Sequence, residues 1–376
     1  MRIITASLVF FALLFCVIPA DAQNAGRPWW FRLEEGKFLF RNGEYGGALV
    51  AFDDARRSRL EQFTRVEQDL IRLLSTPEAR QLGDSLYFVE RLIEMRNETQ
   101  AAAALAYLFH RVPRSVVGGS ATRALEELDR LKPFPEAEFW MGEAFMAEGE
   151  WHLALVQFER AWHYRALLET PGFELKILFR ITDIHRMRQE YAAMEARALE
   201  VITQAGVSLP PQDNLWASML LRAAMVNLLE NEGVNRFLSL YRDGNIAAEP
   251  AHRLLGSFFH VTRRDFPALE HLMFAFLIQN TVIIDYVIRR QFDFAFTTLE
   301  DLMSVALTRP ALVAFMEEVE YFRIAFYFAT ALHATGRTAP ALEVWNFLAN
   351  SEHSGIWGVR ARLTTLPVLE PAIELP

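Results

Sequence analysis

Two stretches of this chain place small residues and aromatic rings at the same spacing, and this constrains the fold more than any other feature. The first contains Gly36, Gly43, Tyr45, Ala48, Phe52 and Ala55, and the second contains Gly142, Gly149, Trp151, Ala154, Phe158 and Ala161. A glycine or alanine lets two helices approach closely, and a ring fills the space beside it. A glycine in the turn can take the positive φ that ends the first helix. The spacing predicts antiparallel helix pairs.

Weaker copies of the pattern follow along the chain. Three are centred on Thr182, Gly256 and Ala329, and two partial ones cover residues 101–113 and 282–302. One helix pair cannot hide its own apolar faces, so neighbouring pairs must stack. Segments between the breakers show no alternation of β-branched residues at period two, which strands would require. We therefore expect an all-α fold.

The spacing resembles that of the tetratricopeptide repeat, in which a small residue, a Gly-x-aromatic turn and an Ala-aromatic-Ala helix recur. The resemblance extends over about two thirds of the chain after residue 22 and implies a right-handed superhelical solenoid with about seven repeats. We expect the solenoid to span residues 23–350 as one continuous array, followed by a tail at 351–376 that contains three prolines. Residues 213–241 fit the pattern poorly and are predicted to form a helical pair.

The N-terminal residues 1–22 are predicted to be a secretory signal. Arg2 precedes an apolar run at 3–18, and small residues follow at Ala20 and Ala22. We therefore expect an exported, periplasmic protein. An alternative stays open, in which Cys16 is a lipid-attachment site, although Phe15 stands where such signals usually have a small residue. With cleavage after Ala22 the mature chain has no thiol, which excludes disulfides and cysteine chemistry.

Charge and motifs argue against several function classes. The chain carries 38 basic and 47 acidic residues, a net charge of −9, which is the wrong balance for a duplex-binding protein. The nine histidines form no His-Glu-x-x-His pair, and there is no Gly-x-Ser-x-Gly elbow or phosphate-binding glycine loop. The acidic cluster of Glu317, Glu318 and Glu320 is interpreted as a solvated helix face. We expect no catalytic, metal or cofactor-binding residues.

A membrane-spanning segment after the signal is not expected. The most apolar stretch, residues 272–288, contains Gln279, Asn280 and Asp285. An unpaired Asp285 would be costly in lipid, so we expect this stretch to be a helix buried on most of its circumference.

The family resemblance implies that the first helix of each pair lines a concave groove. The partner-binding candidates on these helices are Trp30, Phe40, Arg41, Phe139, Trp140, Phe179, Arg180, Arg323, Phe326 and Tyr327. The same frame also directs a second set of side chains into the groove: Leu33, Lys37, Glu143, Met146, Asp183, Arg186, Arg253, Ser257, His260, Thr330 and His333. Aromatic rings interleaved with arginines suit an extended peptide or an apolar helix. The lysine and asparagine clamp of the chaperone-binding members is missing.

These features favour a non-enzymatic periplasmic scaffold or adaptor that binds an envelope protein or peptide. Two alternatives stay open. One is a transporter-associated accessory that handles a small hydrophobic ligand, and the other is a lipidated outer-membrane assembly component.

Overall fold

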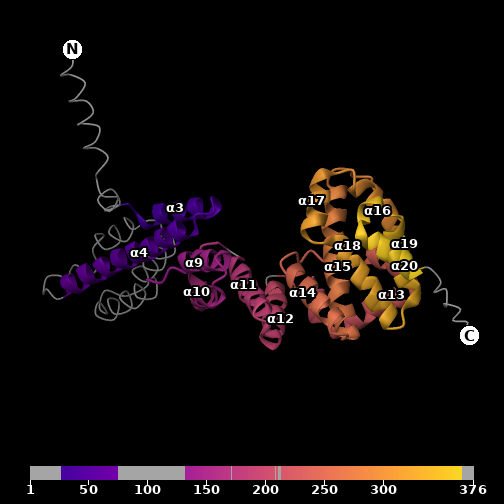
Figure 1. Ribbon diagram of the computed structural model, residues 1–376, viewed down its shortest axis with the longest axis horizontal. Helices are drawn as coiled ribbons and strands as arrows, with labels where there is room; N and C mark the ends of the chain where they lie inside the picture. Colours follow the sequence, from indigo (N-terminus) through magenta and orange to yellow (C-terminus); the bar gives the residue numbers. More distant parts are fainter. Residues whose placement is uncertain (1–26, 75–131, 171, 208, 211–212, 366–376) are drawn as a thin grey trace, which may run out of the picture. The chain divides into compact units, whose positions relative to one another are not determined.

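The computed structural model describes residues 27–74, 132–170, 172–207, 209–210 and 213–365 (Figure 1). Within these ranges the protein has fourteen α-helices and no β-strand, which confirms the predicted all-α fold. The predicted signal, Cys16, the partial repeat at 101–113 and the chain beyond residue 365 lie outside the described residues.

The chain divides into two compact units, residues 1–177 and 178–376. The boundary falls within helix α11 (Phe173–Met187). The described part of unit 1 contains α3 (Trp29–Arg41), α4 (Tyr45–Leu74), α9 (Pro135–Ala147), α10 (Trp151–His163) and the short η2 (Arg165–Leu167). Its core joins α3, α4 and α9 through buried side chains that include Trp29, Phe52 and Phe134.

Unit 2 begins with the rest of α11 and is built around one central helix. Its helices are α12 (Tyr191–Val207), η3 (Leu215–Ala217), α13 (Met219–Leu240), α14 (Glu249–Val261), α15 (Asp265–Ile288), α16 (Leu299–Ala306), α17 (Pro310–Glu318), α18 (Tyr321–Ala334), α19 (Thr338–Asn350), η4 (Glu352–Ser354) and α20 (Ile356–Thr365). Helix α15 packs against both α14 and α18 (Figure 1). Of the described helices, α15 is the one long and apolar enough to cross a membrane, and 78% of its apolar window is buried in the protein.

Five helix pairs share one local geometry. In each, a small residue on the first helix is followed seven residues later by a left-handed turn residue and sixteen residues later by a packing residue on the second helix. The five sets are Gly36, Gly43 and Phe52; Gly142, Gly149 and Phe158; Thr182, Gln189 and Ala198; Gly256, Arg263 and Leu272; and Ala329, Gly336 and Trp345.

The small residue is a steric requirement in three of these pairs. A Cβ added at Gly36 would lie 2.4 Å from the Phe52 ring, and one at Gly142 would lie 2.8 Å from the Phe158 ring. At Gly256 it would lie 2.7 Å from Leu272. The two helices of each of these pairs can therefore approach this closely only because glycine has no side chain.

The partial repeat at 282–302 is not a separate helix pair. Residues 282–288 continue α15, Ala295 lies in a non-helical stretch, and the short α16 follows. The buried Asn280 within α15 has hydrogen-bond partners. The Asn280 amide donates to the Phe276 carbonyl at 2.8 Å and accepts from the Tyr321 hydroxyl at 3.0 Å.

The folded chain extends past the predicted boundary at residue 350. Helix α20 covers most of the described part of the expected tail. Its Trp357 ring packs 5.6 Å from the rings of both Phe326 and Tyr327 and so joins α20 to α18. The sequence pattern alone, which depends on small residues, gave no sign of this aromatic contact.

Residues 213–241 are helical, as expected, but form η3 and a broken α13. The break is at Gly233, with φ 82° and ψ 179°. The Glu343 carboxylate of α19 accepts hydrogen bonds from the backbone N–H groups of Val234, at 2.7 Å, and Asn235, at 3.0 Å. It thus caps the second half of α13 from a distant part of the sequence.

Candidate functional site

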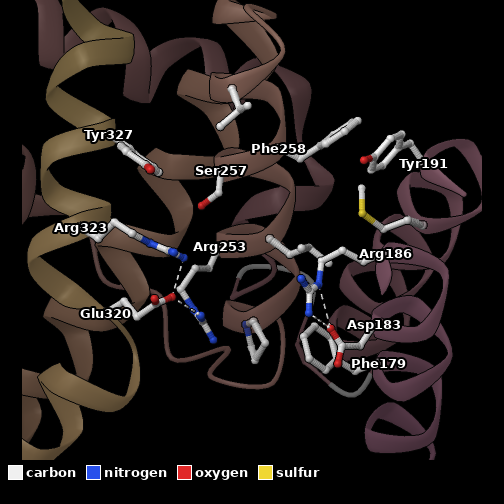
Figure 2. Close-up of a pocket in the computed structure, with 14 residues that line it drawn as sticks. Phe179, Asp183, Arg186, Tyr191, Arg253, Ser257, Phe258, Glu320, Arg323 and Tyr327 are labelled. Atoms are coloured by element: carbon white, nitrogen blue, oxygen red, sulfur yellow. Dashed lines mark hydrogen bonds and ion pairs between the residues drawn. The ribbon is translucent and has the colours of Figure 1, made fainter. Parts of the chain in front are cut away.

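A pocket of about 580 Å³ opens in unit 2 among α11, α12, α14 and α18 (Figure 2). Its lining comes from four separate helices and one turn. The lining residues are Phe179, Asp183, Arg186, Tyr191, Met194, Pro250, Arg253, Leu254, Ser257, Phe258, Val261, Glu320, Arg323 and Tyr327. Its volume lies in the range of sites for small molecules or short peptide side chains.

The helical period explains why these side chains converge. Phe179, Asp183 and Arg186 are separated by four and three residues and so share one face of α11. Arg253 and Ser257 on α14 are four residues apart, as are Arg323 and Tyr327 on α18. Three first helices therefore present one face each to the same space.

One half of the pocket is apolar and aromatic. The rings of Tyr191 and Phe258 stack with centroids 5.2 Å apart and an interplanar angle of 26°. Met194 is fully buried beside them, whereas Tyr191 is 47% exposed. Together with Leu254 these side chains give the pocket an apolar wall with an accessible ring at its edge.

The other half carries a network of ion pairs. Glu320 Oε2 lies 3.0 Å from Arg253 Nη1 and 2.5 Å from Arg323 Nη2. Arg253 Nε also pairs with the buried Glu249 at 3.1 Å, and Glu249 accepts from the Gln279 amide at 2.7 Å. Burial raises the pKa of Glu249, against the effect of Arg253. On the α11 side, Arg186 pairs with Asp183 at 2.7 Å.

Two polar atoms of the lining are left without partners. Among the described residues, Ser257 Oγ and Arg323 Nε are buried and make no hydrogen bond. Buried polar groups are normally satisfied, so these two atoms mark a place where the pocket can still form hydrogen bonds.

The structure brings some of the predicted groove residues together and separates others. Phe179, Arg323 and Tyr327 line the pocket, as do the further positions Asp183, Arg186, Arg253 and Ser257. Phe326 is next to the pocket and packs on Trp357, and Arg180 is half-buried outside the lining. The His260 ring lies 4.5 Å from the Tyr327 ring at an interplanar angle of 31°, and the pKa of His260 is lowered by burial and then by Arg263.

The unit 1 candidates do not form a comparable site in the described residues. Trp30 and Arg41 are exposed, while Phe40 and Trp140 are half-buried and pack 5.7 Å apart. Phe139 is fully buried, with Phe158 and Phe173 at 5.5 and 4.6 Å. Phe139 is therefore a core residue and not part of a groove, because it lies three residues before Gly142 and shares its inward face.

Several lining residues were missed by the sequence analysis. Tyr191 and Met194 belong to a second helix, and Phe258 and Val261 lie on the edge of α14. Glu320 was interpreted as part of a solvated face, which is correct for the exposed Glu317 and Glu318. Glu320 instead pairs with Arg253 and Arg323 although its side chain is 40% exposed, and its backbone is left-handed, with φ 54°, just before α18. A non-glycine residue gives no sequence signal for that conformation.

A second titratable cluster lies in the core between α14 and α15. His252 Nδ1 and His271 Nδ1 are 3.1 Å apart, and the Trp216 ring packs 4.7 Å from both imidazoles. Burial lowers the pKa of His252 well below its ordinary value and that of His271 to about 3. Both rings are neutral, so one donates its Nδ1 proton to the other. No group of three or more potential metal ligands gathers anywhere in the described ranges.

No protein-family model matches the chain. An uncharacterized protein of Treponema pallidum (strain Nichols) is 25% identical over 324 residues, which covers 86% of each chain. The similarity extends over nearly the whole length and carries no functional description.

Proposed function

We propose that this protein is a non-enzymatic adaptor of the tetratricopeptide type that binds an extended segment of another protein in the unit 2 pocket. The observation that carries the proposal is the convergence of three first-helix faces on one cavity whose lining combines arginines with aromatic rings (Figure 2). Such a combination suits a peptide, because rings provide contact area and guanidinium groups fix orientation.

The local geometry of the helix pairs supports the repeat assignment. The offsets of seven and sixteen residues recur in five pairs, and the close approach at Gly36, Gly142 and Gly256 is what stacked hairpins of this family require. In a solenoid each pair contributes its first helix to the binding surface, which agrees with the source of most pocket residues.

The proposal includes export to the cell envelope. Residues 1–22 have the composition of a secretory signal, and cleavage after Ala22 would leave Gln23 at the new N-terminus. The partner would then be a periplasmic or membrane-associated protein. Determining the N-terminus of the protein purified from its native cells tests this, and a lipid-modified N-terminal Cys16 would instead support the anchored alternative.

Photo-crosslinking tests the binding site directly. A photoreactive phenylalanine analogue replaces Tyr191, whose exposed ring lies at the pocket edge, or Leu342, an exposed control on α19. Irradiation of native cells should give a discrete protein adduct from position 191 and none from position 342. No adduct at 191, or the same adducts at both positions, would contradict the proposal.

A second candidate function follows from the size of the cavity. About 580 Å³ with one apolar wall is sufficient for a small hydrophobic molecule, as expected of a transporter-associated accessory. Native mass spectrometry separates the two functions, because a bound small molecule adds a defined mass to the purified protein. A mass equal to that of the chain alone, together with the crosslink at 191, favours the adaptor.

A further inference from the structure

The charged half of the pocket contains one carboxylate held between two guanidinium groups. Glu320 Oε2 contacts Arg253 at 3.0 Å and Arg323 at 2.5 Å (Figure 2). Glu320 adopts φ 54° and ψ 41°, a left-handed conformation that glycine takes without penalty and other residues take at a cost. Its ion pairs offset that cost. The carboxylate, and not the backbone conformation, therefore favours a glutamate at this position.

Glu320 is the member of this network that can leave most easily. It projects from the turn between α17 and α18, and its side chain is 40% exposed. Arg253 would keep its other partner, the buried Glu249, which is fixed by Gln279. Departure of Glu320 would therefore leave Arg323 as the group without a carboxylate neighbour in the pocket.

The charges around the pocket support this assignment. Asp183 neutralises Arg186, and Glu249 neutralises Arg253, so each of these guanidinium groups has its own carboxylate. With Glu320 turned out to solvent, the site has one uncompensated positive charge at Arg323. Two further donors of the lining, Arg323 Nε and Ser257 Oγ, make no hydrogen bond within the described part of the chain.

The apolar half sets a second requirement. Tyr191, Phe258, Met194 and Leu254 form a wall that offers dispersion contacts and no charge. A ligand that fills the pocket must therefore combine a carboxylate with an apolar group.

We propose that Glu320 is an internal substitute for a ligand carboxylate and that the pocket binds an amphipathic anion. The ligand carboxylate replaces Glu320 between Arg253 and Arg323, and the apolar group packs on Tyr191 and Phe258. This inference rests on the proposed peptide-binding function and specifies the peptide: an acidic group, from a chain terminus or from an Asp or Glu side chain, next to an apolar side chain.

Three short peptides test the proposal with the purified protein. Ac-Gly-Leu-Phe-OH has a terminal carboxylate, Ac-Glu-Leu-Phe-NH2 has a side-chain carboxylate, and Ac-Gly-Leu-Phe-NH2 has none. Calorimetric titration should show that at least one acidic peptide binds about tenfold more tightly than the neutral one, as charge-assisted hydrogen bonds predict. The better of the two acidic peptides identifies the source of the carboxylate.

Variants of the pocket distinguish competition from simple structural support. Glu320→Gln removes the competing charge and should tighten binding of the acidic peptide about tenfold while leaving the neutral peptide unchanged. Arg323→Gln should abolish the preference for acid. Glu317→Gln, on the exposed face of α17, is the matched control and should have no effect. Glu320→Gly relieves the left-handed strain and provides a second charge-free variant.

Equal affinity for acidic and neutral peptides would overturn the inference and leave the adaptor function intact. Weaker acid binding in both Glu320 variants would also overturn it, because Glu320 would then support the site. If none of the peptides binds, the inference is likewise wrong, and the crosslink at position 191 decides the adaptor function separately.

Discussion

Acid should destabilise the protein through the buried pair of His252 and His271. In the unfolded chain each imidazole has its ordinary pKa of about 6.5. In the folded protein burial lowers the pKa of His252 well below that value and that of His271 to about 3. Between these values the unfolded state binds protons that the native state does not, so the free energy of unfolding falls as the pH falls.

The size of the effect follows from this difference. Each histidine changes the free energy of unfolding by at most about 1.4 kcal/mol per pH unit. Lowering the pH from 6.5 to 4.5 therefore removes about 2.3 kcal/mol through His271. His252 adds a contribution of the same sign, because burial lowers its pKa as well. The contribution is fully present above pH 6.5 and is lost progressively toward pH 3.

Urea unfolding followed by circular dichroism at pH 6.5, 5.5 and 4.5 measures this contribution. The double variant His252→Gln/His271→Gln keeps polar side chains but does not titrate. As the pH falls, the unfolding free energy of the wild type should decrease relative to that of this variant. Buried carboxyl groups such as Glu249 titrate in both proteins and cancel in the difference. His353→Gln, at an exposed position, is the control. Parallel pH curves for wild type and double variant would refute the reasoning.

Three substitutions test the packing, each by urea denaturation. Gly36→Ala should cost about 1–3 kcal/mol, because its Cβ would lie 2.4 Å from the Phe52 ring, whereas Gly46→Ala, with no atom within 4 Å, should cause no loss; equal effects would refute close approach. Glu343→Ala should cost about 1 kcal/mol by uncapping the second half of α13, and an unchanged stability would show that solvent replaces the cap. Phe139→Ala should cost about 3–5 kcal/mol, because the ring is fully buried. A loss below about 1 kcal/mol would show that Phe139 is not a core residue.

The helix pairs could be predicted because their determinants are close in sequence. A glycine at 36 or 142 and a ring sixteen residues later lie in the same hairpin, so their contact needs no knowledge of the rest of the fold. The pattern was less informative where the packing residue is small, as in the pair of Thr182 and Ala198. It failed at 282–302, where residues 282–288 belong to α15 and Ala295 lies in a non-helical stretch.

The site could be predicted only in part, for physical reasons. The spacing of Phe179, Asp183 and Arg186 places them on one helical face, and all three lie in the lining of the pocket. Tyr191 and Phe258 join it through the packing of one helix pair on the next, which no local pattern encodes. The position of Glu320 in the pocket could not be predicted, because its backbone is left-handed and a non-glycine residue gives no sequence signal for that conformation.

The long-range cap on α13 limits how unit 2 can be shortened. In an array of stacked repeats, each repeat contacts only its neighbours. Here α19 supplies Glu343 to the backbone at Val234 and Asn235, and Arg337 pairs with Glu230 at 3.2 Å. Deleting the last hairpin would therefore expose the broken end of a helix encoded about a hundred residues earlier, and unit 2 is expected to fold or fail as a whole.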